Sequence, residues 1–192
     1  MSLETSLCGV KLRNPTVLSS GILGTSGSIL KRVAKAGAGA VTTKSLGLGP
    51  RTGWKNPILC GYESGMINAV GLANPGYGNF SKEIKIGKEG GSPVIASIFG
   101  SSPEEYAKIA SAVEGFGADM IELNVSCPNT EKKIICTDTK LVAEADSKVQ
   151  SKVNIPAPPK LRPNVNDIEF GSDDENDAVI SPWCSRPRSP PC

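Results

Sequence analysis

Short apolar runs alternate along the chain with segments whose apolar residues recur at helical spacing. The short runs are typical of buried strands, and they fall at residues 15–20, 40–45, 94–98 and 120–125. The helical spacing predicts three helices, at residues 28–36, 103–115 and 137–149. Strands that alternate with helices favour a parallel sheet, so the pattern predicts an α/β fold.

The helix after residue 102 has the clearest start signal in the chain. Ser102 is suited to the N-cap, Pro103 fits the first helical position, and Glu105 completes a capping box. Its inward stripe is expected to consist of Tyr106, Ile109, Ala110 and Val113. We therefore expect an amphipathic helix that Gly115 or Gly117 ends.

Two segments of the first half do not follow this alternation. Residues 3–8 and 10–12 flank Gly9 and predict a small hairpin. Residues 46–80 are too rich in glycine and proline for a regular element, so we expect a long loop there. Loops of that length are usually functional.

The alternation fails beyond residue 155. A fifth strand is expected to begin near Ile155. A central strand needs its backbone N–H donors, and three prolines remove donors there: Pro156, Pro158 and Pro159. Residues 169–177 contain five acidic side chains, and residues 182–192 contain four prolines with two arginines. We therefore expect one domain over residues 1–167 and a disordered or aberrant tail over residues 168–192.

Composition narrows the chemistry that this chain can perform. It has no histidine, which excludes imidazole acid–base catalysis and histidine-ligated metal. The six cysteines include no Cys-x-x-Cys pair, so a zinc or cluster site is not expected. The net charge of +2, with mixed signs, does not suggest nucleic-acid binding. Without an apolar run of signal or membrane length, we expect a cytoplasmic protein with reduced thiols and no membrane contact.

Cys127 lies where the fourth strand is expected to end, in the run at residues 120–130. Pro128 breaks strand pairing directly after it. Asn124, Cys127 and Asn129 are therefore placed at the carboxyl end of a strand, where α/β enzymes assemble their active sites. A thiol beside two carboxamides suits proton transfer on a neutral, amide-rich substrate. The alternative is a buried cysteine that packs as a small hydrophobe.

Polar residues also fall at the ends of the other expected strands, at Ser20, Lys44 and Ser97. In a barrel such ends converge on one face. Lys44 follows an apolar pair, so we expect it to be partly desolvated and to need an anionic or carbonyl partner; a solvated lysine past the strand end is the alternative. The amides of Asn68 and Asn74 in the long loop suit a planar amide ligand, although such loops also occur as plain turns.

Four short runs occur in order between about residues 3 and 167. They are Thr-Lys-Ser at 43–45, Asn-Ala-Val-Gly-Leu at 68–72, Asn-Val-Ser-Cys-Pro-Asn at 124–129 and a divergent Lys-Leu-Arg-Pro-Asn-Val at 160–165. Together they resemble the catalytic subunit of the class 1 dihydroorotate dehydrogenases, FMN-containing (β/α)8 barrels of pyrimidine synthesis. The cysteine-containing run is the most specific, because a cysteine base marks class 1.

The resemblance implies a role for each matching residue. Cys127 would take the proton from carbon 5 of dihydroorotate while hydride leaves carbon 6 for N5 of the flavin. The implied FMN contacts are Ser20, Lys44, Ser45, Ser97, Asn124 and Lys160. The implied contacts with dihydroorotate or orotate are Lys44, Asn68, Ala69, Val70, Gly71, Leu72, Asn124 and Asn129.

The sequence that follows residue 68 resembles class 1B most. That class pairs with an iron–sulfur flavoprotein subunit, which passes electrons to NAD. The resemblance thus implies an electron-transfer partner and, for the full-length form, an oligomer.

The chain departs from the family pattern after about residue 156. The family has an apolar fifth strand and Lys-Leu-Ser-Pro-Asn, where this chain has Pro158, Pro159 and Arg162. A complete barrel usually needs about 250 residues, so we expect a partial TIM barrel from a truncated or frame-shifted gene. Such a chain would lack the phosphate-binding loops and would not be active as written. The alternative is a catalytically dead half-barrel that serves as a binding or assembly module.

Overall fold

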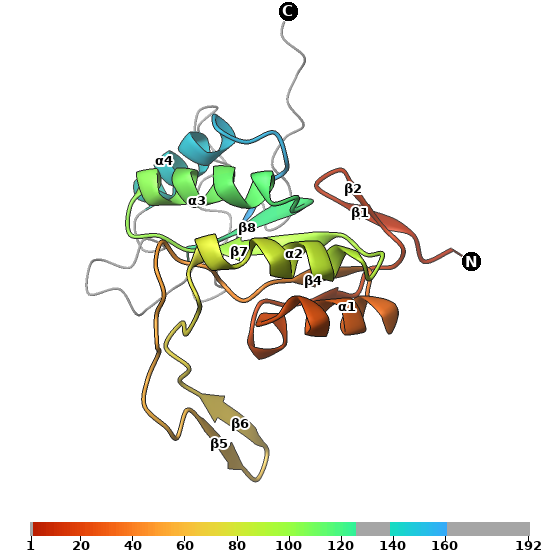
Figure 1. Ribbon diagram of the computed structural model, residues 1–192, viewed down its shortest axis with the longest axis vertical. Coiled ribbons are helices and arrows are strands. Elements are labelled where there is room, and N and C mark those ends of the chain that lie inside the picture. Colours follow the sequence, from red (N-terminus) through yellow and green to blue (C-terminus); the bar gives the residue numbers. More distant parts are fainter. Residues whose placement is uncertain (1, 126–138, 161–192) are drawn as a thin grey trace, which may run out of the picture.

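The computed structural model describes residues 2–125 and 139–160, and its centre is a five-stranded parallel sheet in the order β3-β4-β7-β8-β9. The strands are β3 (Val17–Leu18), β4 (Ala40–Thr42), β7 (Val94–Ile98), β8 (Met120–Asn124) and β9 (Pro159–Lys160). A helix joins each strand to the next (Figure 1), in the order α1 (Gly27–Lys35), α2 (Ser81–Lys88), α3 (Pro103–Gly115) and α4 (Thr139–Gln150). This arrangement is the first part of a β/α barrel, which confirms the expected fold class.

Apolar side chains cover both faces of the sheet. On the face toward the helices, residues such as Val41, Ala96 and Ile121 are fully buried in the main core. The opposite face, here called the inner face, packs against a hairpin of β1 (Thr5–Leu7) and β2 (Val10–Leu12). That second core contains Leu12, Ala40, Ile95 and Met120. The amino-terminal hairpin predicted from the sequence is therefore confirmed, and it covers the amino-terminal end of the inner face.

Helix α3 begins as its capping signal predicts. The Ser102 hydroxyl accepts a hydrogen bond from the Glu105 backbone N–H at 3.4 Å, and Pro103 is the first helical residue. The Glu105 carboxylate accepts from the backbone N–H of Ser101, at 2.8 Å, one residue before the N-cap. Both bonds satisfy donors at the start of the helix that have no partner within it.

The expectation of a loop without regular elements over residues 46–80 is wrong. This segment contains an antiparallel hairpin of β5 (Leu59–Tyr62) and β6 (Gly65–Asn68), which projects away from the sheet (Figure 1). Every residue of both strands is exposed. A hairpin is held by backbone bonds between its own strands, which glycine does not prevent, so composition alone misjudged it.

Helix α2 was also not predicted. Only Ile84 and Gly87 are buried in this helix. Two positions are too few to show helical spacing of apolar residues in the sequence. The helix is stabilised by contact with α1, where a β-carbon added at Gly87 would lie 3.3 Å from the Leu30 side chain. This close approach of two helices depends on glycine and is a tertiary effect.

The proline-rich fifth strand pairs with β8 through its carbonyl groups. The backbone N–H groups of Ile121 and Leu123 donate to the carbonyls of Pro156 and Pro158, at 2.8 Å and 3.0 Å. A proline loses its donor but keeps its acceptor, so half of each parallel pairing survives. The prolines therefore do not remove this segment from the sheet, in which the described part of the strand is Pro159–Lys160.

The closest packing between α1 and α2 gives a test of this architecture. A β-carbon at Gly27 would lie 2.3 Å from the Glu83 backbone oxygen, whereas one at Gly115 would meet nothing within 4 Å. We expect Gly27→Ala to lower the free energy of unfolding by about 1–3 kcal/mol through overpacking. Gly115→Ala, the matched control in α3, should leave stability unchanged or raise it by about 0.5–1 kcal/mol. Urea unfolding measures both; equal effects would contradict the close contact.

Candidate active site

A cluster of polar side chains lies where the parallel strands end. Ser45 is the centre of this cluster and is only 3% exposed. Its hydroxyl lies 3.1 Å from that of Ser20 and 2.9 Å from that of Ser97, and it accepts from the Asn124 amide nitrogen at 3.0 Å. Four residues that the sequence placed at separate strand ends are thus brought into one hydrogen-bonded group.

The cluster continues to a carboxylate that the sequence reading missed. The Ser97 hydroxyl donates to Glu122 Oε1 at 2.8 Å, and Lys160 Nζ donates to the same oxygen at 2.7 Å. Glu122 shares the inner face with Met120 and Asn124, because alternate residues of a strand point the same way. A charged residue in the middle of an apolar strand was the signal that could have found it.

Lys44 is buried at the same end of the sheet, with 9% of its surface exposed. Its backbone N–H donates to the Gly24 carbonyl at 2.8 Å, which holds the chain directly after β4. The burial excludes the alternative of a solvated lysine past the strand end. A buried ammonium group favours an anionic or carbonyl partner.

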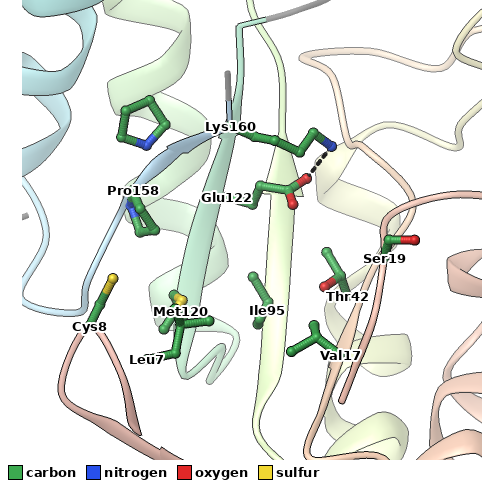
Figure 2. A pocket seen from close by; sticks show the side chains of 11 residues that line it. Leu7, Cys8, Val17, Ser19, Thr42, Ile95, Met120, Glu122, Pro158 and Lys160 are labelled. Atoms are coloured by element: carbon green, nitrogen blue, oxygen red, sulfur yellow. Dashed lines mark hydrogen bonds and ion pairs between the residues drawn. The ribbon is translucent and has the colours of Figure 1, made fainter. Parts of the chain in front are cut away.

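Below the cluster, the inner face encloses a hollow of about 320 Å³. Figure 2 shows its apolar wall, to which Val17, Ile95 and Met120 contribute, and the Glu122–Lys160 ion pair at its side. The hairpin residues Leu7 and Cys8 also line it, near Met120 (Figure 2). In a complete barrel this part of the inner face is filled by side chains, so the polar groups at the strand ends, rather than the hollow, mark the candidate site.

A family model described as dihydroorotate dehydrogenase matches residues 2–178. The chain belongs to the dihydroorotate dehydrogenase family. The match extends past residue 167, where the sequence motifs had placed the limit of the resemblance.

Several curated relatives carry the name "Dihydroorotate dehydrogenase B (NAD(+)), catalytic subunit". The protein of Methanocella arvoryzae is 48% identical over 170 residues, which cover 88% of this chain and 56% of that protein. For Methanothermobacter thermautotrophicus the identity is 47%, over 86% of this chain and 55% of the relative. These names support the class 1B-like catalytic subunit inferred from the motifs. The chain spans about half the length of the curated relatives it matches.

The loop predicted to hold the substrate does not join the serine cluster through any hydrogen bond found in the described part of the chain. Asn68 and Ala69 are exposed, and Val70 accepts from the backbone N–H of Trp54 at 3.2 Å. Gly71 and Leu72 have positive φ angles of 72° and 56°. The structure therefore places the predicted substrate residues 68–72 at the base of the exposed hairpin.

Asn74, the second asparagine of this loop, has a structural role. Its side-chain oxygen accepts from the backbone N–H groups of Gly47 and Gly76, at 3.2 Å and 2.9 Å. Its amide nitrogen donates to the Leu72 carbonyl at 2.8 Å. These bonds tie both ends of the loop together, so the amide of Asn74 is committed to the backbone.

Cys127 and Asn129 lie outside the described residues. The chain that leads to them is held in place, because the buried Tyr106 hydroxyl donates to the Asn124 carbonyl at 2.9 Å. Their predicted roles, like the predicted ligand contacts of the other site residues, stay predictions. In the parts of the chain that are described, no helix is long and apolar enough to cross a membrane.

The central position of Ser45 leads to a stability prediction. Ser45→Ala removes a group that bonds Ser20, Ser97 and Asn124 in a buried setting, so we expect unfolding to become easier by about 1–3 kcal/mol. Ser111→Ala is the control, since its hydroxyl only bonds the Ala107 carbonyl within α3. Urea unfolding of both variants is the measurement. A Ser45→Ala protein as stable as Ser111→Ala would mean that the cluster is not formed in solution.

Proposed function

We propose that this chain supplies the amino-terminal half of a flavin site that oxidises dihydroorotate to orotate in pyrimidine synthesis. The observation that carries the proposal is the cluster of Ser20, Ser45, Ser97 and Asn124 at the strand ends of a dihydroorotate dehydrogenase-family chain. Buried Lys44 and the side chain of Lys160 add two cations at the same end.

The residues present fit the isoalloxazine ring of FMN. Such a ring is flat, carries carbonyl and nitrogen groups on one edge, and is apolar on its faces. Lys44 and Lys160, beside the serine cluster at the strand ends, can donate to the polar edge of the ring. When bound, FMN supplies the hydride acceptor for the reaction.

The protein's own groups would bind the substrate and move its proton. Asn68 to Leu72, Asn124 and Asn129 would hold the amide edges of dihydroorotate. The Cys127 thiolate would accept the proton from carbon 5 while the hydride leaves carbon 6, so a carbon–carbon double bond forms. We further propose that the protein works in the cytoplasm with an iron–sulfur flavoprotein partner. The relatives are named as the catalytic subunit of an NAD-linked enzyme, which supports the existence of a partner subunit.

A chimera tests whether this half of the site is competent. Residues 1–160 would be joined to the carboxyl-terminal half of the Methanocella arvoryzae relative, and the product compared with the 192-residue chain. We expect the chimera to retain FMN and oxidise dihydroorotate. The chain alone should lose FMN on purification, because barrels of this kind bind the phosphate after strands seven and eight. A folded chimera that neither binds FMN nor oxidises dihydroorotate would overturn the proposal.

Cys127→Ala in the chimera addresses the general base. Turnover should fall by roughly two to four orders of magnitude, the usual contribution of general-base catalysis, while the flavin content stays unchanged. Cys60→Ala is the control, because Cys60 is an exposed free cysteine on β5. Near-normal turnover in Cys127→Ala would exclude this base.

Asn68→Ala and Asn124→Ala probe substrate binding in the same chimera. Each should weaken orotate binding by about 1–3 kcal/mol, because a buried group of the ligand is left unpaired. Asn79→Ala, whose amide donates to the Pro75 carbonyl on the surface, is the matched control. Titration with orotate, followed by the flavin absorbance, gives the affinities. If both site variants bind orotate like the control, the pocket lies elsewhere.

A further inference from the structure

Glu122 links the serine cluster to Lys160 by hydrogen bonds. Its Oε1 atom accepts from Ser97 on the neighbouring strand β7 and from Lys160 on the neighbouring strand β9. Its side chain is 18% exposed, whereas that of Lys160 is 41% exposed. The carboxylate is thus a largely buried acceptor that links the serine cluster to the lysine.

The donor in every bond of this group can be assigned from chemistry. The Glu122 carboxylate, paired with the Lys160 ammonium, offers only acceptors, so the single hydroxyl hydrogen of Ser97 goes to it. Ser97 must then accept from Ser45 across their 2.9 Å contact. Ser45 has no second hydrogen, so it accepts from both Ser20 and Asn124. The hydroxyls therefore point in one direction, from Ser20 toward Glu122.

The direction of these hydrogen bonds determines which atom of the Asn124 amide faces Ser45. A Ser45 hydroxyl that donates to Ser97 turns its lone pairs toward Asn124, which favours the amide nitrogen over the amide oxygen at that contact. The Tyr106 hydroxyl holds the backbone carbonyl of the same residue. The orientation of the Asn124 side chain therefore depends on a carboxylate that it does not touch.

We propose that Glu122 is a positioning residue for this site: through Ser97 and Ser45 it sets the orientation of the Asn124 amide, and directly it holds Lys160. The inference rests on the proposed function only in taking Asn124 and Lys160 as ligand contacts. Glu122 itself touches neither flavin nor substrate in this scheme.

The carboxylate of the Glu122–Lys160 ion pair is less exposed than that of a surface ion pair of the same residue types. Glu104 and Lys148 also pair, but the Glu104 side chain is 62% exposed, lies on α3 and, within the described residues, makes no hydrogen bond to Ser20, Ser45 or Ser97. The hydrogen bond from Lys148 lowers the pKa of the Glu104 carboxyl. Such exposed pairs contribute little to stability or order. Glu104→Gln is therefore a matched control for Glu122→Gln.

The test uses the purified 192-residue chain and two variants, Glu122→Gln and Ser97→Ala. Each variant interrupts the series of hydrogen bonds from Ser20 to Glu122 at a different point. Nuclear magnetic resonance would measure the exchange with water of the Asn124 side-chain amide hydrogens. Weakening the bond to Ser45 should speed this exchange about three- to tenfold in either variant. The double variant should exchange no faster than a single variant, because both changes break the same series of hydrogen bonds. Glu104→Gln should leave the exchange unchanged.

Titration of the same proteins with FMN at up to millimolar concentration gives the second readout. We expect weak binding by the unaltered chain, and about three- to tenfold weaker binding by Glu122→Gln than by Glu104→Gln. Unchanged Asn124 exchange in Ser97→Ala and Glu122→Gln would overturn the inference whatever the FMN result. Altered exchange with unchanged FMN affinity would overturn the positioning role. If the unaltered chain does not bind FMN at all, the proposed function fails for this chain, while the exchange data still decide the hydrogen-bond order.

Discussion

In a parallel sheet, residues that pair in register point to the same face, and every strand ends at the same edge. The pairing of β7 with β8 sets Ser97 beside Glu122, and the pairing of β8 with β9 sets Asn124 beside Lys160. The ladder of backbone bonds therefore assembles the site. A shift of one residue in either pairing would turn these side chains to the helix-covered face, where the main core leaves no place for them.

The inner face changes character along the strands. Its lower part is apolar and is covered by the amino-terminal hairpin, while its upper part carries serines, Glu122, Asn124 and Lys160. Polar groups in such a position need partners, because an unpaired buried donor or acceptor costs about 1–3 kcal/mol. Within the residues that the structure describes, every buried side-chain nitrogen or oxygen has a hydrogen-bond partner. The cluster is thus a satisfied network, which gives its members one preferred arrangement.

Strand β9 shows how a weak segment is retained in the sheet. Glu114 on α3 accepts from the backbone N–H groups of Asn154 and Ile155, at 2.7 Å and 3.1 Å, and fixes the approach to the strand. The proline carbonyls then accept from β8, and the ion pair of Lys160 with Glu122 follows at the end. Side-chain contacts at both ends compensate for the donors that the prolines lack. In the described part of the molecule, β3 and β9 form the two edges of the sheet.

The sequence by itself determined two kinds of element: helices with their own capping residues, and strands made of a continuous run of apolar residues. The capping residues of α3 and the apolar run of β7 predicted these elements closely, and the apolar runs placed Ser20, Lys44, Ser97 and Asn124 at strand ends. The sequence could not show helix α2 or the β5–β6 hairpin, because one depends on close packing against α1 and the other on backbone pairing. Only the tertiary structure joined Ser20, Ser45, Ser97 and Asn124 and added Glu122 to them. Hydrogen bonds between strands depend on register and direction in space, and residues as far apart as Ser45 and Asn124 carry no mark of such a contact in a single sequence.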